Sequence, residues 1–204
     1  MRAHLREQAL VNLQEYEVLM IDGHFDYGNG YHGRVYLNPH RLFRQPSLIW
    51  RFAQDLIAML PESVTEATDV VAGPVMGGAL LAHTIAGLLD ARRSLTRPRA
   101  SFAPISNDAS GALSLRPFYR EVVVGQRVLL ADDVRNTGKT FERAKAVIEQ
   151  AQGRVVATVE IYDRLEAIVD LGVPNFALAE YRAAENFLAA DCPLCRAGVP
   201  IAAF

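Results

Sequence analysis

The chain has 204 residues, of which half are hydrophobic and 22% are charged, and its formal net charge at pH 7 is -2. These values are typical of a globular protein with one α/β domain, and they leave no basic field large enough for nucleic acid. Charges at Arg2, Arg6 and Glu7, together with the lack of a long uncharged apolar run, predict neither an export signal nor a membrane span.

The first part of the chain, up to about Pro46, is rich in Gly, His, Tyr and Asn, and its apolar residues are scattered. We expect it to be irregular or short-stranded. From Leu48 to Leu60 the apolar residues recur at spacings of three and four, which predicts an amphipathic helix that ends at Pro61. The residues with this spacing are Leu48, Phe52, Leu56 and Met59.

An apolar run, a turn and a helix then follow one another twice. Asp69–Ala72 is the first run, and Gly77–Leu89 is typical of a mostly buried helix. Arg127–Ala131 is the second run, and Thr140–Ala151 has the next helical pattern. The apolar face of that helix is made of Phe141, Ala144, Val147, Ile148 and Ala151. With a further β-branched run at Val155–Ile161, this alternation predicts a parallel sheet flanked by helices, with ligands at the carboxyl ends of the strands.

Two adjacent acids and a Thr-Gly-Lys-Thr sequence lie between the second apolar run and its helix. The N–H groups of a helix N-terminus can bind a phosphate, and the carboxylates of Asp132 and Asp133 can accept hydrogen bonds from sugar hydroxyls or bind Mg²⁺. The ending Gly138-Lys139-Thr140 is shared with nucleotide-triphosphate P-loops, but Asp133 occupies the position of their first glycine. A turn or a helix cap is the structural alternative for the acids. The flanking sequences favour a sugar phosphate.

The four apolar residues, the two acids and the loop resemble the phosphoribosyl pyrophosphate (PRPP) motif of type I phosphoribosyltransferases. The resemblance implies an α/β fold with a parallel sheet flanked by helices and a small hood from the two terminal segments. It also implies that Asp132 and Asp133 contact the ribose as catalytic residues and bind Mg²⁺, directly or through water. The implied 5'-phosphate loop comprises Arg135, Asn136, Thr137, Gly138, Lys139 and Thr140, with Asn136 where a threonine or serine is usual.

Three further segments extend the resemblance over nearly the whole chain. The turn after the first apolar run is similar to the family's pyrophosphate loop, which implies pyrophosphate binding by Val75, Met76, Gly77 and Gly78. Gly23-His24-Phe25, Gly30-Tyr31-His32-Gly33 and the tail Cys192-Pro193-Leu194-Cys195 resemble a subgroup of orotate phosphoribosyltransferases. This implies base binding by Phe25, Tyr31 and His32. It also implies one domain, 1–204, with a PRPP-binding core at about 47–174 and a hood from about 1–46 and 175–204.

The segment Arg99–Arg120 has the length and polarity of a mobile active-site flap. In orotate phosphoribosyltransferases this flap carries lysine, arginine and often histidine, but this chain has no lysine or histidine there. A departing pyrophosphate needs cations. The candidates are Arg99 for pyrophosphate binding, Arg116 as a catalytic residue, and Mg²⁺.

The histidines and cysteines have separate structural interpretations. Cys192 and Cys195 are half of a zinc site, and with no second pair or nearby histidine in the sequence we expect thiols packed in the tail. His24 and His32 are candidates for hydrogen bonds within a Gly-rich loop. Two cysteines are too few for a disulfide framework, which favours a reducing cytoplasm.

Three functional hypotheses follow. The first is Mg²⁺-dependent transfer of phosphoribose from PRPP to orotate, which releases pyrophosphate and belongs to pyrimidine nucleotide biosynthesis. The second is a catalytically weak regulatory paralogue that binds PRPP or nucleotides. The third is a phosphoribosyltransferase for a different base. In each case the partners are small molecules, with no nucleic acid and no membrane, and the resemblance implies a homodimer.

Overall fold

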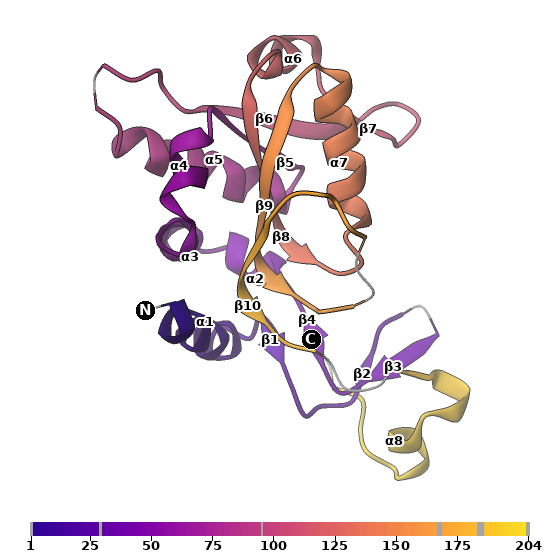
Figure 1. Cartoon of the computed structure of the whole chain (residues 1–204). Coiled ribbons are helices and arrows are strands. Elements are labelled where there is room, and N and C mark those ends of the chain that lie inside the picture. Colours follow the sequence, from indigo (N-terminus) through magenta and orange to yellow (C-terminus); the bar gives the residue numbers. More distant parts are fainter. Residues whose placement is uncertain (1, 29, 95, 167–168, 183–185, 203–204) are drawn as a thin grey trace.

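The computed structural model describes residues 2–28, 30–94, 96–166, 169–182 and 186–202, and a six-stranded sheet forms its centre (Figure 1). Five neighbouring strands are parallel, and only the edge strand β7 is antiparallel. The predicted α/β fold is therefore confirmed. In sheet order the strands are β10 (Asn175–Glu180), β9 (Arg154–Asp163), β8 (Arg127–Arg135), β5 (Val70–Pro74), β6 (Ser101–Asn107) and β7 (Leu113–Ser114).

Helices cover both faces of this sheet, and each face has its own apolar core (Figure 1). Because successive strand residues point to opposite faces, Val71 and Leu129 belong to one core and Val70 and Leu130 to the other. Strands buried on both faces read as continuous apolar runs, which is why they were visible in the sequence. The covering helices are α1 (Arg2–Glu15), α3 (Pro46–Met59) and α5 (Gly77–Ala91) on the first face and α7 (Lys139–Gln150) on the second.

The predicted helices at 48–60 and 140–151 are confirmed within two residues at each end. Pro46 begins α3 at a position where its missing N–H costs no hydrogen bond, and Leu60 is already extended ahead of Pro61. Helix α7 buries Phe141, Ala144 and Ile148. Burying a side chain of the size of phenylalanine or isoleucine contributes roughly 1.5 to 3 kcal/mol.

The prediction for the N-terminal segment is wrong for its first residues, because Arg2–Glu15 forms the helix α1. This helix packs against β10 and α3 through a narrow stripe in which Ala9 and Leu13 are fully buried. A stripe this narrow in an otherwise polar helix gives almost no periodic signal. The short strands expected after it are present: β1 (Leu19–Met20), β2 (Phe25–Asp26), β3 (Tyr31–Gly33) and β4 (Tyr36–Leu37).

A small three-stranded sheet lies beyond the carboxyl edge of the main sheet (Figure 1). In it β11 (Asn186–Leu188) pairs with β3, so the C-terminal segment folds back on the N-terminal one. The expected hood boundary at 175 does not coincide with this unit, since β10 begins at Asn175 and pairs with β9 in the main sheet. After β11 come the 3-10 turn η1 (Ala189–Asp191) and α8 (Pro193–Arg196).

The segment predicted to be a mobile active-site flap contains regular elements. Strands β6 and β7 form a hairpin, and α6 (Pro117–Val123) follows it. The Asp108 side chain accepts hydrogen bonds from the Ser110 and Ala112 amides, which organises the tip of the hairpin. The remaining helices are α2 (His40–Phe43) and α4 (Glu62–Ala67). Among the described residues, no helix combines the length and the apolar character that a membrane crossing needs.

Candidate active site

Two predicted motifs meet where β5 and β8 end. Gly77 and Gly78 begin α5 directly after β5, and they lie against Asp133 and Asp132. A Cβ atom on Gly78 would be 2.8 Å from Asp132 Oδ1, and one on Gly77 would overlap the Asp133 carboxylate. Only glycine at these two positions leaves room for the acids, so the predicted pyrophosphate loop and the predicted ribose acids form one site.

The acids lie in β8 itself, although the sequence pattern placed them at the start of a loop. Strand β8 continues to Arg135 because its ladder with β9 includes the pairs Asp132–Glu160 and Arg135–Asp163. Only residues 136–138 form the connection to α7. The apolar run ends at Ala131, which is where the sequence predicted the end of the strand. The backbone pairing continues through the polar residues that follow.

Burial raises the pKa of two carboxyl groups at this site, those of Asp132 and Glu160. Asp132 is only 7% exposed, and burial, reinforced by the neighbouring Asp133 charge, raises the pKa of its carboxyl well above the usual range. Burial also raises the pKa of Glu160 to about 8, although Asn175 Nδ2 donates a hydrogen bond of 2.7 Å to its Oε1. Hydroxyl donors or a cation placed at Asp132 would therefore be stabilised strongly.

The connection to α7 has the geometry of an anion site. Gly138 has φ +84° at the N-cap, and its carbonyl accepts the Glu142 N–H at 3.0 Å. The amides of the first helical turn therefore point out of the helix end. Lys139 and Thr140 are exposed there. Arg135 is buried instead. Its Nη2 donates to the Val169 carbonyl at 3.3 Å, so its side chain links the end of β8 to the segment between β9 and β10.

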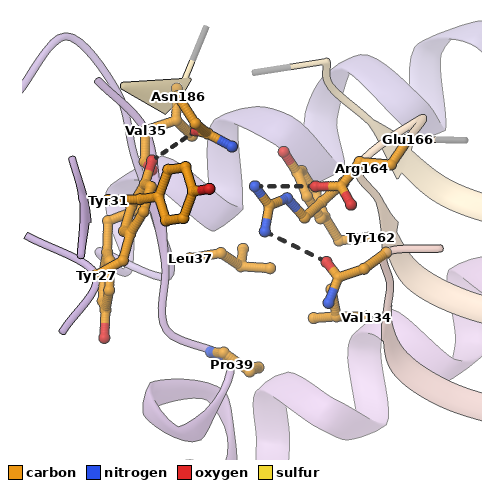
Figure 2. A pocket seen from close by; sticks show the side chains of 12 residues that line it. Tyr27, Tyr31, Val35, Leu37, Pro39, Val134, Tyr162, Arg164, Glu166 and Asn186 are labelled. Atoms are coloured by element: carbon orange, nitrogen blue, oxygen red, sulfur yellow. Dashed lines mark hydrogen bonds and ion pairs between the residues drawn. The ribbon is translucent and has the colours of Figure 1, made fainter. Parts of the chain in front are cut away.

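A cavity of ≈ 480 Å³ lies between the hood strands and the carboxyl ends of β8 and β9 (Figure 2). Tyr31 and Asn186 come from the hood side, and Arg164 lies across from them, just after β9. The Arg164 guanidinium lies 3.2 Å from Glu166 Oε1 and 3.5 Å from Asn136 Oδ1. The lining residues are Tyr27, Tyr31, Val35, Tyr36, Leu37, Pro39, Val134, Asn136, Tyr162, Arg164, Glu166 and Asn186.

The three predicted base-binding residues differ in their position relative to this cavity. Tyr31 lines this cavity and is 44% exposed. Phe25 and His32 are buried, and within the described part of the chain they are not among the lining residues. Their base-binding roles stay predictions. Arg164 was missed by sequence reasoning, and the available signal was its position directly after the last long β-branched run.

A second cavity, of ≈ 800 Å³, lies between the β6–β7 hairpin and α7. Val75 and Thr140, both predicted site residues, line it together with Arg120 and Arg143. The peptide bond between Val75 and Met76 is cis. Arg116 is exposed at the start of α6 and, of the residues described, is not among those lining this cavity.

Arg99 lies apart from these residues. It is exposed and precedes β6 by two residues, whereas Val75 follows the carboxyl end of the neighbouring parallel strand β5. The two residues therefore lie at opposite ends of the parallel strands, and the structure does not bring Arg99 to the predicted pyrophosphate loop.

Comparison with known proteins assigns this arrangement to a family, because residues 48–171 match the profile of the phosphoribosyl transferase domain. The chain belongs to the phosphoribosyltransferase family. This phosphoribosyltransferase is 32% identical to the orotate phosphoribosyltransferase of Heliobacterium modesticaldum, over 89% of the chain and 88% of the relative. It is 30% identical to that of Caldicellulosiruptor bescii over the same shares.

Solved structures agree on the fold of this phosphoribosyltransferase. The orotate phosphoribosyltransferase of Aeropyrum pernix matches with a TM-score of 0.63 at 21% identity, covering 84% of this chain and 92% of that one. An adenine phosphoribosyltransferase from Thermoanaerobacter pseudethanolicus matches with a TM-score of 0.62 at 19% identity, covering 83% and 99%. Similarity at these identities extends to enzymes for different bases, so it identifies the fold alone.

Proposed function

We propose that this phosphoribosyltransferase converts PRPP and orotate into orotidine 5'-monophosphate and pyrophosphate, in pyrimidine nucleotide biosynthesis. The observation that carries the proposal is the cavity between hood and sheet, which combines tyrosine walls with Arg164 and is also lined by Val134, the residue that follows the two acids in β8. The relatives named orotate phosphoribosyltransferase, which match 89% of the chain, support the same reaction. A solved relative from Mycobacterium tuberculosis, with a TM-score of 0.54, is described in complex with PRPP.

The sugar phosphate would occupy the edge formed by β8 and α7. The 5'-phosphate would accept hydrogen bonds from the amides of residues 137–140, whose positive helix end favours an anion. Asp132 and Asp133 would accept hydrogen bonds from the ribose hydroxyls. The burial of Asp132 against Gly78 supports this, since buried carboxyl groups need donors.

The base would enter the cavity of Figure 2, between Tyr31 and Arg164. A flat pyrimidine suits the face of a tyrosine ring, and the Arg164 guanidinium can pair with a carboxylate in two-point fashion. Orotate carries such a carboxylate and uracil does not. Glu166, the present ion-pair partner of Arg164, would have to exchange for the substrate, which an exposed pair permits at low energetic cost.

The pyrophosphate would lie between residues 75–78 and the hairpin cavity, where Arg120 and Arg143 can offset its charge. Asp132 and Asp133 fit Mg²⁺, because carboxylate oxygens are its preferred protein ligands and the burial of Asp132 beside the Asp133 charge favours a cation. The chemistry that Mg²⁺ supplies when bound is neutralisation of pyrophosphate oxygens.

In the reaction, a ring nitrogen of orotate bonds to the anomeric carbon of PRPP and gives up its proton to solvent, and the bond from that carbon to the pyrophosphate oxygen breaks. The electron pair of the broken bond leaves with pyrophosphate. Positive charge that develops on the ribose lies next to Asp132 and Asp133, which stabilise it electrostatically. The protein therefore acts by orienting the reactants and by complementing charge, with no covalent intermediate.

Pyrophosphate release from PRPP and Mg²⁺, measured with orotate, uracil, adenine and hypoxanthine, tests this function. Orotate-dependent release supports the proposal, and release with another base alone would replace orotate by that base.

The second candidate, a PRPP-binding regulator, is favoured by the hairpin, whose residues 107–114 contain no lysine or histidine. PRPP binding by calorimetry without release for any base would select it. The homodimeric state and the cytoplasmic location belong to the same proposal, and sedimentation would test the first.

A further inference from the structure

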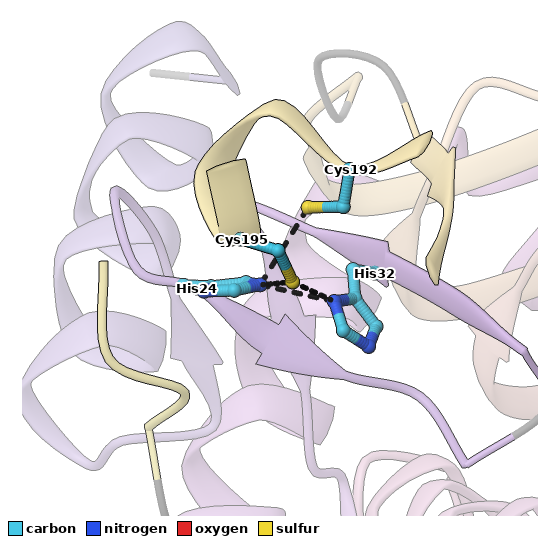
Figure 3. Close-up of side chains that lie close together, drawn as sticks. All are labelled: His24, His32, Cys192 and Cys195. Carbon is cyan, nitrogen blue, oxygen red and sulfur yellow. Dashed lines mark hydrogen bonds between the residues drawn. The ribbon is translucent and has the colours of Figure 1, made fainter. Parts of the chain in front are cut away.

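Four side chains from opposite ends of the chain converge in the hood (Figure 3). His24 and His32 come from the N-terminal segment, and Cys192 and Cys195 border α8 near the C-terminus. One ligand atom from each lies within 4.8 Å of all the others. His24, His32 and Cys192 are buried, and Cys195 is exposed. The expectation from the sequence that no histidine accompanies the two cysteines is therefore wrong.

Four of the six distances among these atoms are close to the edges of a tetrahedron around one ion. His24 Nε2 is 3.0 Å from His32 Nδ1 and 3.6 Å from each cysteine sulfur, and Cys195 Sγ is 3.3 Å from His32 Nδ1. Zinc bonds of about 2.3 Å to sulfur and about 2.0 Å to nitrogen give tetrahedral edges of about 3.3 to 3.8 Å. The two ring nitrogens are slightly closer than such an edge, so the rings would have to move a little apart around the ion.

An oxygen lies near the outer nitrogen of each ring. His24 Nδ1 lies 2.8 Å from the Val199 carbonyl, so this nitrogen carries the proton and Nε2 keeps its lone pair toward the cluster. His32 Nε2 faces Asp26 Oδ1 at 3.8 Å, which leaves Nδ1 toward the cluster. Metal-bound histidines usually donate their outer N–H to a backbone carbonyl or a carboxylate, which fixes the orientation of the ring.

We propose that His24, His32, Cys192 and Cys195 bind one Zn²⁺ ion as a structural site. Two thiolates and two imidazoles in tetrahedral arrangement select zinc among the divalent ions. With four protein ligands no coordination position is open for a substrate, so the site is structural. A two-iron cluster with one iron per residue pair would separate sulfur from nitrogen by more than the 3.3 Å between Cys195 and His32.

The ion would tie the two ends of the chain together beside the base cavity. His32 lies on β3 next to Tyr31, which lines that cavity, and β3 also pairs with β11, which contributes Asn186. The Ala202 amide donates to the His24 carbonyl at 2.7 Å, so the last described residues join the same unit. Zinc would therefore hold in place a hood that has too few buried apolar residues to be stable alone.

Metal analysis of the full-length protein, purified from zinc-supplied cells without chelator, tests the site. The expected content is one zinc per chain in the wild type and in His83→Ala, an exposed histidine outside the cluster that serves as the matched control. Cys192→Ser, Cys195→Ser and His24→Ala should lose nearly all of it. Zinc far below one per chain in the wild type, or unchanged content in these variants, would overturn the proposal.

Measurements on the wild type guard against variants that fail to fold. Protein stripped by a chelator and reloaded with Co²⁺ should show the visible absorption of a tetrahedral ion and a thiolate charge-transfer band. Both cysteines should react with a thiol reagent in the stripped protein and be protected in the zinc form. Reloaded protein without these bands, or thiols equally reactive in both forms, would reject the site whatever reaction the protein catalyses.

Discussion

Asp132 and Glu160 are register partners on the neighbouring parallel strands β8 and β9, and both carboxyl groups are buried. Glu160 is one of the charges that raise the pKa of Asp132, after burial and Asp133. One Oε atom of Glu160 has no hydrogen-bond partner within the described structure. A stack of acids inside a sheet costs stability, and the cost depends on pH.

Glu160→Gln should stabilise the protein increasingly as the pH rises. The pKa of Glu160 is raised from 4.5 to about 8, so its contribution to folding is most favourable below pH 4.5 and is lost as the pH rises through about 8. The largest gain in unfolding free energy expected from the substitution is about 1.4 kcal/mol for each unit by which the pKa is raised. Urea unfolding at several pH values from 5 to 8.5 measures this, with the exposed Glu121→Gln as control. A stability difference that does not change with pH would contradict it.

The double substitution Asp132→Asn and Asp133→Asn should reduce kcat/KM by at least about 100-fold, because charge complementarity to the ribose is lost. The fold should remain, since removing buried charge relieves an electrostatic cost. Steady-state kinetics with PRPP and orotate and a thermal melt measure the two effects. Glu149→Gln, on the exposed part of α7, is the control. Unchanged kinetics in the double variant would remove the ribose assignment.

Gly77→Ala should lower kcat/KM, because its new methyl group overlaps the Asp133 carboxylate and also meets the Phe43 ring, 2.7 Å from the Cβ position. Gly87→Ala, in the same helix, is the matched control because its Cβ meets nothing within 4 Å. That control should be neutral or more stable by up to about 1 kcal/mol, the difference in helix propensity. Equal activities in the two variants would show that the contact with Asp133 is unimportant.

Arg164→Gln should weaken orotate use selectively. Loss of a hydrogen-bonded charge pair costs about 1.5 to 3 kcal/mol, or roughly a ten- to a hundredfold fall in kcat/KM for orotate. PRPP binding in the absence of base should stay within twofold. The control is Arg154→Gln, exposed at the opposite end of β9. Equal losses for PRPP and orotate would place Arg164 outside the base site.

The fold was predictable wherever burial leaves a regular signal. The wide apolar face of α3 and the continuous apolar runs of β8 and β9 could be read directly, whereas α1 buries so narrow a stripe that its period was invisible. Glycine and acid motifs also marked the two segments that meet at Asp132 and Asp133, for which PRPP binding stays a prediction. Arg164 had only a weak local signal, its position just after β9, and the meeting of His24 with Cys195, 171 residues apart, depends on tertiary packing that no local pattern encodes.

The extension of β8 through Arg135 fixes the backbone of the two acids that we propose bind the ribose. Under the proposed function, the backbone on both sides of Asp133 is already paired with β9, at Asp132 and Val134, before PRPP arrives, so little backbone entropy would be lost when the ribose binds. The three residues that connect to α7 have no such ladder. Adaptation to the ligand should therefore be concentrated at the phosphate, while the sugar meets a surface that is already in its final shape.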